Sequence, residues 1–220
     1  MKKKLLLILI PILIFLYFPI ISSVKEIEVS GNHYVSKEEI IATSELKNSY
    51  LTLINKNDVL KRLMTIKLIK KIKFKQLSLT KIKILVEEKE IIMIGHIGKK
   101  IGHIDSDNEL ILNVSEYIDY NFPIFTSDLE ANINNGVLIL NLLTSKNVLN
   151  IEEISEISYD EIIGVTIFTS DGTKIYVGNN DFSEKIINLK IILEDGEKRR
   201  KKESYIDISN TKKGVVNYNL

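Results

Sequence analysis

Hydrophobic residues are distributed unevenly along the chain, and the longest apolar run stands near its beginning. Leu5 to Ile21 contains no charged residue and follows three lysines, Lys2 to Lys4. A helix over residues 5–24 spans about 30 Å at ~1.5 Å per residue, which is the thickness of a bilayer's hydrocarbon core. Because lysines stay on the cytoplasmic side, the pattern predicts a cytoplasmic tail (residues 1–4), a transmembrane helix (5–24) and an extracytoplasmic remainder.

A cleaved signal peptide is the alternative interpretation of this segment, because Pro11 and Pro19 interrupt it. Cleavage requires small residues one and three positions before the cut, and residues 20–24 fit that requirement poorly. The chain has no cysteine that could carry a lipid. The sequence therefore favours a retained anchor over a cleaved signal.

Residues 24–90 change from strand periodicity to helical periodicity and back. Alternating apolar and charged residues predict a strand over 24–29, and Ser36 to Glu39 matches a helix capping box. A second helix is predicted after Asn55, and two alternating runs predict strands over 71–75 and 81–86. The order β-α-α-β-β describes a small α+β domain with helices on one face of a sheet.

Residues 91–220 predict a mixed, mostly antiparallel β domain with flanking helices. The predicted elements are strands over 91–94, 100–104 and 110–112, a helix over 137–149, strands over 165–169 and 174–177, a helix over 181–196, and strands over 204–208 and 215–218. Val137 to Leu143 also fits a buried strand, although Asn135-Gly136 favours a helix. Asp171-Gly172 is typical of a hairpin turn, and Asp181 to Glu184 matches a capping box.

Charge divides the exported part in two. Residues 24–90 carry 14 Lys and Arg against 9 Asp and Glu, whereas residues 91–220 carry 13 against 20. This pattern indicates a basic module near the membrane followed by an acidic distal one. The lysines of residues 71–83 either meet anionic lipid or form the solvated face of two strands, and both interpretations stay open.

Candidate chemistry is sparse. The chain has three histidines and no cysteine, so cysteine metal sites, disulfides and thiol catalysis are excluded. His96 and His103 are predicted on neighbouring strands without carboxylates at ligand spacing, and Asp105 to Glu109 is interpreted as a turn rather than a calcium loop. No phosphate-binding loop, dinucleotide fingerprint or Gly-x-Ser-x-Gly motif occurs. Ser78 to Lys81 matches the Ser-x-x-Lys nucleophile pattern, but its companion motifs are absent, so the match is interpreted as coincidence. We therefore predict no catalytic residue, no metal, no cofactor and no small-molecule substrate.

The basic run Lys198 to Lys202 is the densest charge cluster. No aromatic residue that could stack on a base lies within the run, and the predicted location is outside the cytoplasm, so nucleic acid is not predicted as a partner. A solvated loop is the favoured interpretation, and a binding contact is the alternative.

Three segments of the first module resemble a POTRA domain: Val24 to Asn32, Val35 to Ile40 and Lys81 to Lys89. They match its first strand with a Gly-Asn turn, its first helix and its closing strand. Further segments resemble the end of the FtsQ/DivIB division proteins: Asn121 to Ile124, Phe168 to Gly178, Glu184-Lys185, Tyr205 to Ile208 and Gly214 to Val216. Together with the anchor, the resemblance covers nearly the whole chain, with Ser209 replacing the family's usual arginine.

The resemblance implies a non-catalytic, single-pass scaffold of the bacterial division machinery in the cytoplasmic membrane at the septum. It implies membrane partners of the FtsB and FtsL type, which would add a strand to the distal domain, and it leaves septal cell-wall synthases as further candidate partners. The implied partner-binding residues are Tyr205, Ile206, Asp207, Ile208, Gly214, Val215, Val216 and Tyr218. A POTRA-containing export or outer-membrane assembly factor is the alternative function, and an enzyme is the least favoured one.

Overall fold

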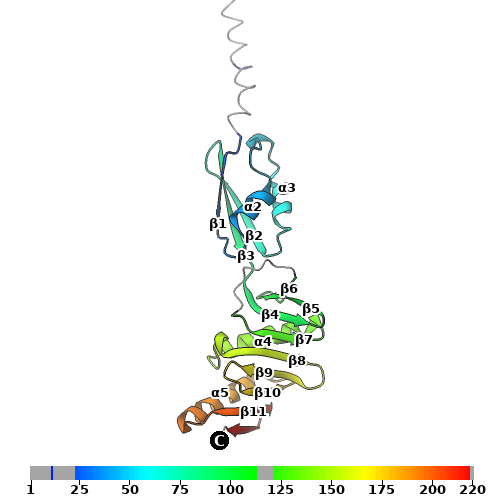
Figure 1. The fold of residues 1–220 in the computed structure, drawn as a ribbon, viewed down its shortest axis with the longest axis vertical. Coiled ribbons are helices and arrows are strands. Elements are labelled where there is room, and N and C mark those ends of the chain that lie inside the picture. Colours follow the sequence, from blue (N-terminus) through cyan, green and yellow to red (C-terminus); the bar gives the residue numbers. More distant parts are fainter. Residues whose placement is uncertain (1–10, 12–22, 113–120, 219–220) are drawn as a thin grey trace, which may run out of the picture. The chain divides into compact units, whose positions relative to one another are not determined.

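The structure is a computed structural model that describes residue 11, residues 23–112 and residues 121–218 (Figure 1). The predicted cytoplasmic tail and nearly all of the predicted transmembrane helix lie outside the described residues. Within the described ranges, no helix is both long enough and apolar enough to cross a bilayer. The chain forms two compact units, with the boundary between Lys89 and Glu90.

The first unit confirms the predicted order β-α-α-β-β. Its elements are β1 (Glu26–Ser30), α2 (Lys37–Ser44), a 3₁₀ turn η1 (Leu51–Leu53), α3 (Lys56–Leu63), β2 (Ile69–Gln76) and β3 (Lys81–Glu88). The sheet has the order β1-β3-β2, with β1 parallel and β2 antiparallel to β3. Ile82, Ile84 and Val86 of β3 are buried, as the alternation of this strand predicts.

The outer side of this sheet carries a ladder of ion pairs between β1 and β3. The Lys81 ammonium lies 2.7 Å from a Glu26 carboxylate oxygen and 3.6 Å from one of Glu28. Lys83 binds Glu28 as well, and its hydrogen bond holds the pKa of the Glu28 carboxyl below its ordinary value. The positive charges of two lysines of the basic module are thus balanced by carboxylates of the same sheet.

A serine caps the start of α2. The Ser36 hydroxyl accepts a hydrogen bond from the Glu39 amide at 3.1 Å, so the hydroxyl half of the predicted capping box is confirmed. We expect Ser36→Ala to lower the free energy of unfolding of this unit by about 1 kcal/mol, because one helix amide loses its partner. Ser36→Asp is the matched control, since aspartate caps equally well, and urea denaturation followed by circular dichroism measures both. Equal losses in the two variants would contradict the capping role.

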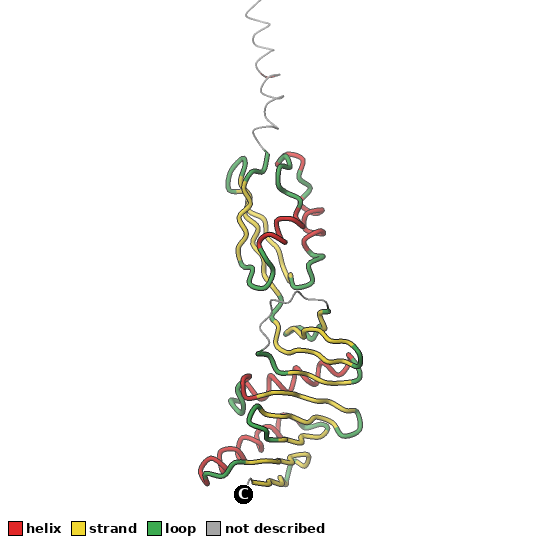
Figure 2. The backbone as a smooth tube through the Cα atoms, in the orientation of Figure 1, coloured by secondary structure: helices red, strands yellow, loops and turns green. Residues whose placement is uncertain are grey.

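The second unit is a nine-stranded mixed sheet that carries two helices (Figure 2). Its elements are β4 (Ile91–Ile97), β5 (Lys100–Asp105), β6 (Leu110–Ile111), β7 (Ile124–Ser127), η2 (Glu130–Asn132), α4 (Ile133–Ser145), η3 (Ile151–Glu153), β8 (Ile154–Asp160), β9 (Gly164–Thr169), β10 (Lys174–Gly178), α5 (Phe182–Arg199), β11 (Glu203–Asn210) and β12 (Lys213–Tyr218). The strand order is β12-β11-β10-β9-β8-β7-β4-β5-β6.

Most neighbouring strands of this sheet are antiparallel, as predicted. The parallel pairs are β4 with β7, β7 with β8, and β10 with β11. Helix α4 connects β7 to β8 and helix α5 connects β10 to β11, which is the usual way to join parallel neighbours. Buried side chains of both helices join those of the strands in one core.

The first helix of this unit begins earlier and ends earlier than predicted. Helix α4 runs over Ile133–Ser145 instead of 137–149, and it passes through Gly136. A Cβ atom at Gly136 would overlap the Phe125 ring, so this glycine lets the helix lie directly on β7. Here the glycine is a close-packing site and not the helix boundary that the sequence indicated.

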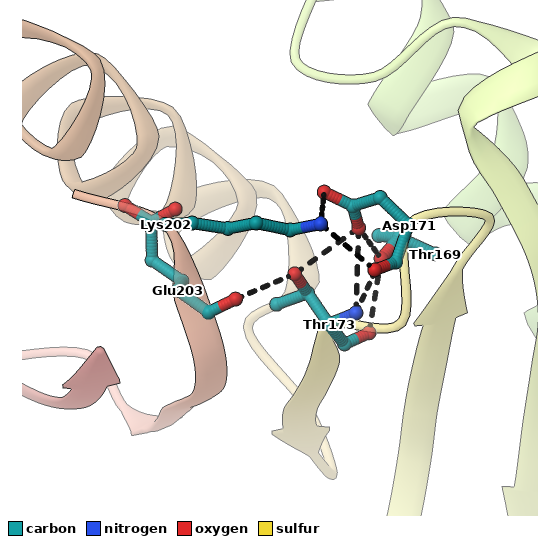
Figure 3. A network of polar contacts seen from close by, with 5 residues as sticks. All are labelled: Thr169, Asp171, Thr173, Lys202 and Glu203. Atoms are coloured by element: carbon teal, nitrogen blue, oxygen red, sulfur yellow. Dashed lines mark hydrogen bonds and ion pairs between the residues drawn. The ribbon is translucent and has the colours of Figure 1, made fainter. Parts of the chain in front are cut away.

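The second helix of this unit starts where the sequence predicts, with Asp181 as its N-cap, but it lacks the predicted capping box and ends later than predicted. Asp181 adopts a left-handed conformation (φ 49°) and its side chain makes no capping hydrogen bond, so the predicted capping box does not form. Helix α5 continues through Gly196 to Arg199. The Glu203 carboxylate, which Figure 3 shows turned toward α5, occupies the position that a Cβ atom of residue 196 would take, so a larger residue there would require this side chain to move.

Candidate partner-binding edge

Strand β12 forms one edge of the large sheet, near the end of the chain (Figure 1). It pairs antiparallel with β11 on one side, and no strand among residues 23–112 and 121–218 pairs with its other side. Such an edge presents a row of main-chain N–H and C=O groups that can accept a further strand. Because β6, at the opposite edge, has only two residues, β12 is the longer of the two edges.

Strand β11 lies inside the sheet. It pairs parallel with β10 over Tyr205 to Asp207 and antiparallel with β12. Ile206 and Ile208 are fully buried and belong to the core. Tyr205, Ile206 and Asp207 therefore have a strand partner on both sides, whereas Ile208 falls at the register shift between Asp207 and Asn210. Of the two strands, only β12 has a side on which no described strand pairs.

The β12 residues differ in exposure. Val215 is 57 % exposed, and Gly214 is exposed beside it. Val216 faces the core, opposite Ile206 in the register of the two strands. The Tyr218 ring lies 5.3 Å from the Lys201 ammonium, at cation–π distance. A strand added to β12 would thus meet Val215 on one face of the sheet and the edge of the core on the other.

A row of four side chains, two of them aromatic, lies across the strands next to β12, and of these the sequence predicts only Tyr205 as a site residue. Asn217, Tyr205, Lys174 and Phe168 stand opposite one another on β12, β11, β10 and β9, so they share one face. This face is opposite the one that carries the buried Ile167, Ile175 and Ile206 and the helices. Burial and the neighbouring Asp207 raise the pKa of the Tyr205 hydroxyl. Only the register brings these residues together, and register cannot be read from one strand at a time.

The basic run forms the predicted solvated loop only in part: its five side chains are exposed, and Lys201 and Lys202 connect α5 to β11, but the run begins within the helix. Lys198 and Arg199 complete the last turn of α5, and Arg200 caps the helix in a left-handed conformation. The Arg199 guanidinium lies 2.8 Å from the Asp195 carboxylate. The helix dipole stabilises positive charges at a helix C-terminus. This explains why a cluster of like charges is tolerated there.

The two histidines and the acidic turn of this unit lie on and directly after the strands β4 and β5. His96 and His103 lie on the adjacent strands β4 and β5, as predicted, but no group of three potential ligands occurs in the described part of the chain. Asp105 accepts hydrogen bonds from the amides of Asp107 and Glu109, which confirms a turn.

Burial lowers the pKa of the His103 imidazole. Between pH 7.5 and 5.5 the unfolded chain therefore takes up a proton that folded His103 resists, so the folded state loses stability as the pH falls. We expect His103→Gln to reduce this loss, measured as the difference in free energy of unfolding between the two pH values. His96→Gln is the control, at an exposed site on the neighbouring strand. Its free energy of unfolding should fall between the two pH values by as much as that of the unsubstituted chain. An unchanged loss in His103→Gln would contradict the assignment.

Together, the small α+β unit and the mixed sheet with a long free edge define a two-domain protein of the α+β class. Comparison with known families identifies both units. Residues 22–89 match the POTRA domain of FtsQ type, and residues 96–209 match the C-terminal domain of the cell division proteins FtsQ and DivIB. The chain therefore belongs to the FtsQ/DivIB family. The second match ends within β11, before β12.

Individual relatives agree with this assignment. The chain is 24 % identical over 203 residues to cell division protein FtsQ of Geobacter sp. (strain M21), covering 86 % of this chain and 74 % of the relative. It is 22 % identical over 209 residues to FtsQ of Syntrophotalea carbinolica, covering 88 % and 73 %. It is 24 % identical over 203 residues to cell division protein DivIB of Staphylococcus pseudintermedius, covering 90 % and 68 %. Family membership supports a role in cell division.

Proposed function

We propose that this chain is a non-catalytic scaffold of the bacterial division machinery that binds partner division proteins by strand addition to β12. The free edge of β12, with Val215 exposed on it, is the observation that carries the proposal. Main-chain hydrogen bonds would supply affinity for the added strand. The side chain of Val215 and the neighbouring row of side chains that includes Tyr205 would supply selectivity. The proposed partners are membrane proteins of the FtsB and FtsL type, with septal cell-wall synthases as a further group.

The proposed arrangement in the membrane follows the hydrophobic pattern of the N-terminal segment. It consists of a cytoplasmic tail (residues 1–4), a transmembrane helix (5–24), a POTRA domain (24–90) and a distal β domain (91–220). Anchoring in the membrane of its partners would raise their effective concentration, which favours a weak strand-addition contact. The chain would thus act at the septum from the outer side of the cytoplasmic membrane.

A depletion experiment tests the proposed role. The full chain, fused to a fluorescent protein, is expressed in cells from which the unfused protein is depleted. We expect depletion alone to produce filaments or chains of cells, and the fusion to form a band at midcell and restore division. Normal division after depletion, or an even signal around the envelope, would contradict the proposal. Loss of outer-membrane proteins without a division defect would indicate the assembly alternative.

A further inference from the structure

The loop between α2 and α3 lies beside the residues at which the described part of the first unit begins. This loop covers residues 46–55 and includes η1. The Val24 amide donates a hydrogen bond to the Ser49 carbonyl at 2.8 Å. Next to this contact, Ser23 forms an antiparallel β-bridge with Tyr50. The loop is thus fixed against the residues that directly follow the long apolar run of the sequence.

The turn between β2 and β3 lies at the same end of the unit. It covers residues 77–80. The Thr80 carbonyl accepts hydrogen bonds from the amide of Lys25 at 2.9 Å and from that of Glu26 at 3.1 Å. Strands β1 and β3 both begin here, because Glu26 is paired with Lys81 in their register. Figure 1 shows this turn and the α2–α3 loop together at the end of the unit where β1 begins.

These two loops, residues 46–55 and 77–80, are called the loop face below, and they expose large apolar side chains. Leu53 is 77 % exposed and Leu79 is 52 % exposed, and Leu77 and Tyr50 are exposed as well. Residues 46–55 contain one lysine and no carboxylate, and residues 77–80 contain no charge. Exposed apolar side chains gathered at one end of a unit are typical of a surface that contacts another molecule or a membrane.

The charges around the loop face favour an anionic surface. The exposed cations are Lys25, Lys47 and Lys56. Glu26 forms an ion pair with Lys81 at 2.7 Å. Glu45 forms one with Arg62 at 3.5 Å. Asp58 lies in the first turn of α3, at the positive end of the helix dipole. The charge that is left on this end of the unit is therefore positive, which suits the anionic headgroups of a membrane.

We propose that the loop face docks on the surface of the membrane that holds the N-terminal anchor. Its apolar side chains would enter the boundary between headgroups and acyl chains, and the neighbouring lysines would contact anionic headgroups. The inference rests on the proposed transmembrane segment, residues 5–24, because the face hydrogen-bonds to the residues at the end of that segment. This position assigns the face to lipid and not to a protein partner. Since the anchor tethers the unit, even a weak contact would be populated.

Tryptophan fluorescence in vesicles tests this docking, because the chain contains no tryptophan of its own. The full chain carrying Leu53→Trp or Leu79→Trp is reconstituted into vesicles of phosphatidylethanolamine and phosphatidylglycerol, with and without brominated phosphatidylcholine. We expect the brominated lipid to remove at least about half of the fluorescence of each variant, because the ring would reach the boundary of the acyl chains that carry the bromine. Unchanged fluorescence of either variant would overturn the proposal.

His33→Trp is the matched control, with the same added ring at the opposite end of the unit. His33 is exposed in the turn after β1. The neighbouring Tyr34 amide donates to the carboxylate of Glu88, the last residue of β3, at 2.8 Å. The brominated lipid should leave the fluorescence of this variant unchanged. Equal quenching of His33→Trp would overturn the proposal, because the added rings would then contact lipid whatever their place in the unit.

An aspartate in one loop tests whether both loops contact the membrane together. Leu53→Asp, added to the Leu79→Trp variant, should reduce the quenching at least about 2-fold, because anionic headgroups repel the carboxylate and acyl chains do not solvate it. Met64→Asp is the control, since Met64 is 50 % exposed at the opposite end of α3, and it should leave the quenching unchanged. Unchanged quenching with Leu53→Asp would overturn the common docking face.

Flotation of the same vesicles separates this inference from the proposed function. A chain that floats with the vesicles after an alkaline carbonate wash is held by its anchor, so flotation without quenching overturns the docking and leaves the anchor in place. A chain that does not float contradicts the proposed anchor, and the docking with it. Neither measurement involves β12, so the proposed strand addition keeps its own test.

Discussion

Replacing Phe125 with alanine is expected to lower the free energy of unfolding of the second unit by about 3–5 kcal/mol. The ring is fully buried on β7, between Gly95 of β4 and Ile157 of β8 in the register of the sheet. Helix α4 lies directly on it, because Gly136 has no side chain to hold the helix away. Removing the ring would leave a cavity between helix and sheet, and a packed core relaxes only partly around such a cavity.

Hydrogen exchange read by mass spectrometry measures this effect within the full chain. We expect faster exchange in β7, β8 and α4, while residues 23–89 supply an internal reference. Phe168→Ala is the matched control, since this ring is only half-buried, on the face of the sheet without helices. This variant should lose clearly less free energy of unfolding than Phe125→Ala. Similar effects of the two variants would contradict the central place of Phe125 in the core.

Replacing Val215 with aspartate is expected to weaken binding of the strand-adding partner by at least about 10-fold while the chain stays folded. The side chain is 57 % exposed in the free protein, so the substitution removes little packing. In the proposed complex it would lie beside the added strand, where a carboxylate is poorly compatible with strand pairing and loses water without gaining a partner. Co-purification of FtsB- and FtsL-type proteins with the full chain measures the loss.

Ile162→Asp is the matched control for this experiment. Ile162 is 88 % exposed in the turn after β8, so the change has the same chemistry at a site away from β12. It should bind the partner as the unchanged chain does. Full binding by a folded Val215→Asp variant would contradict strand addition at β12. Ile206→Asp is unsuitable for this purpose, because it would place a charge in the core.

The sequence could predict much of the fold because most elements carry local signals. Alternation in Lys81–Glu88, the cap at Ser36 and the Asp-Gly turn after Thr169 each depend on neighbours in the chain. Strands β7 and β8 were missed, since Ile124–Ser127 has only four residues and Ile154–Asp160 alternates weakly. Their strand structure depends on pairing with β4, β9 and each other.

Glycines show where local reasoning fails. Gly136 and Gly196 both stand within helices, although the sequence pattern predicts a helix boundary at each. What they provide is space, for Phe125 in one case and for Glu203 in the other. The partners lie far away in the sequence, so no pattern around either glycine could indicate this role.

The sequence by itself determined the two-part α+β organisation and the order of strands and helices in the first unit. It also indicated that the first module is basic and the second acidic, and its motifs pointed to the FtsQ/DivIB family. These features could be recognised because periodicity, turn residues and charge are local properties. Only the tertiary structure decided that β11 is an inner strand and β12 the free edge, and that the Glu203 carboxylate packs against Gly196 of α5. Strand order and register arise from contacts between distant segments, which are selected by the packing of the whole core.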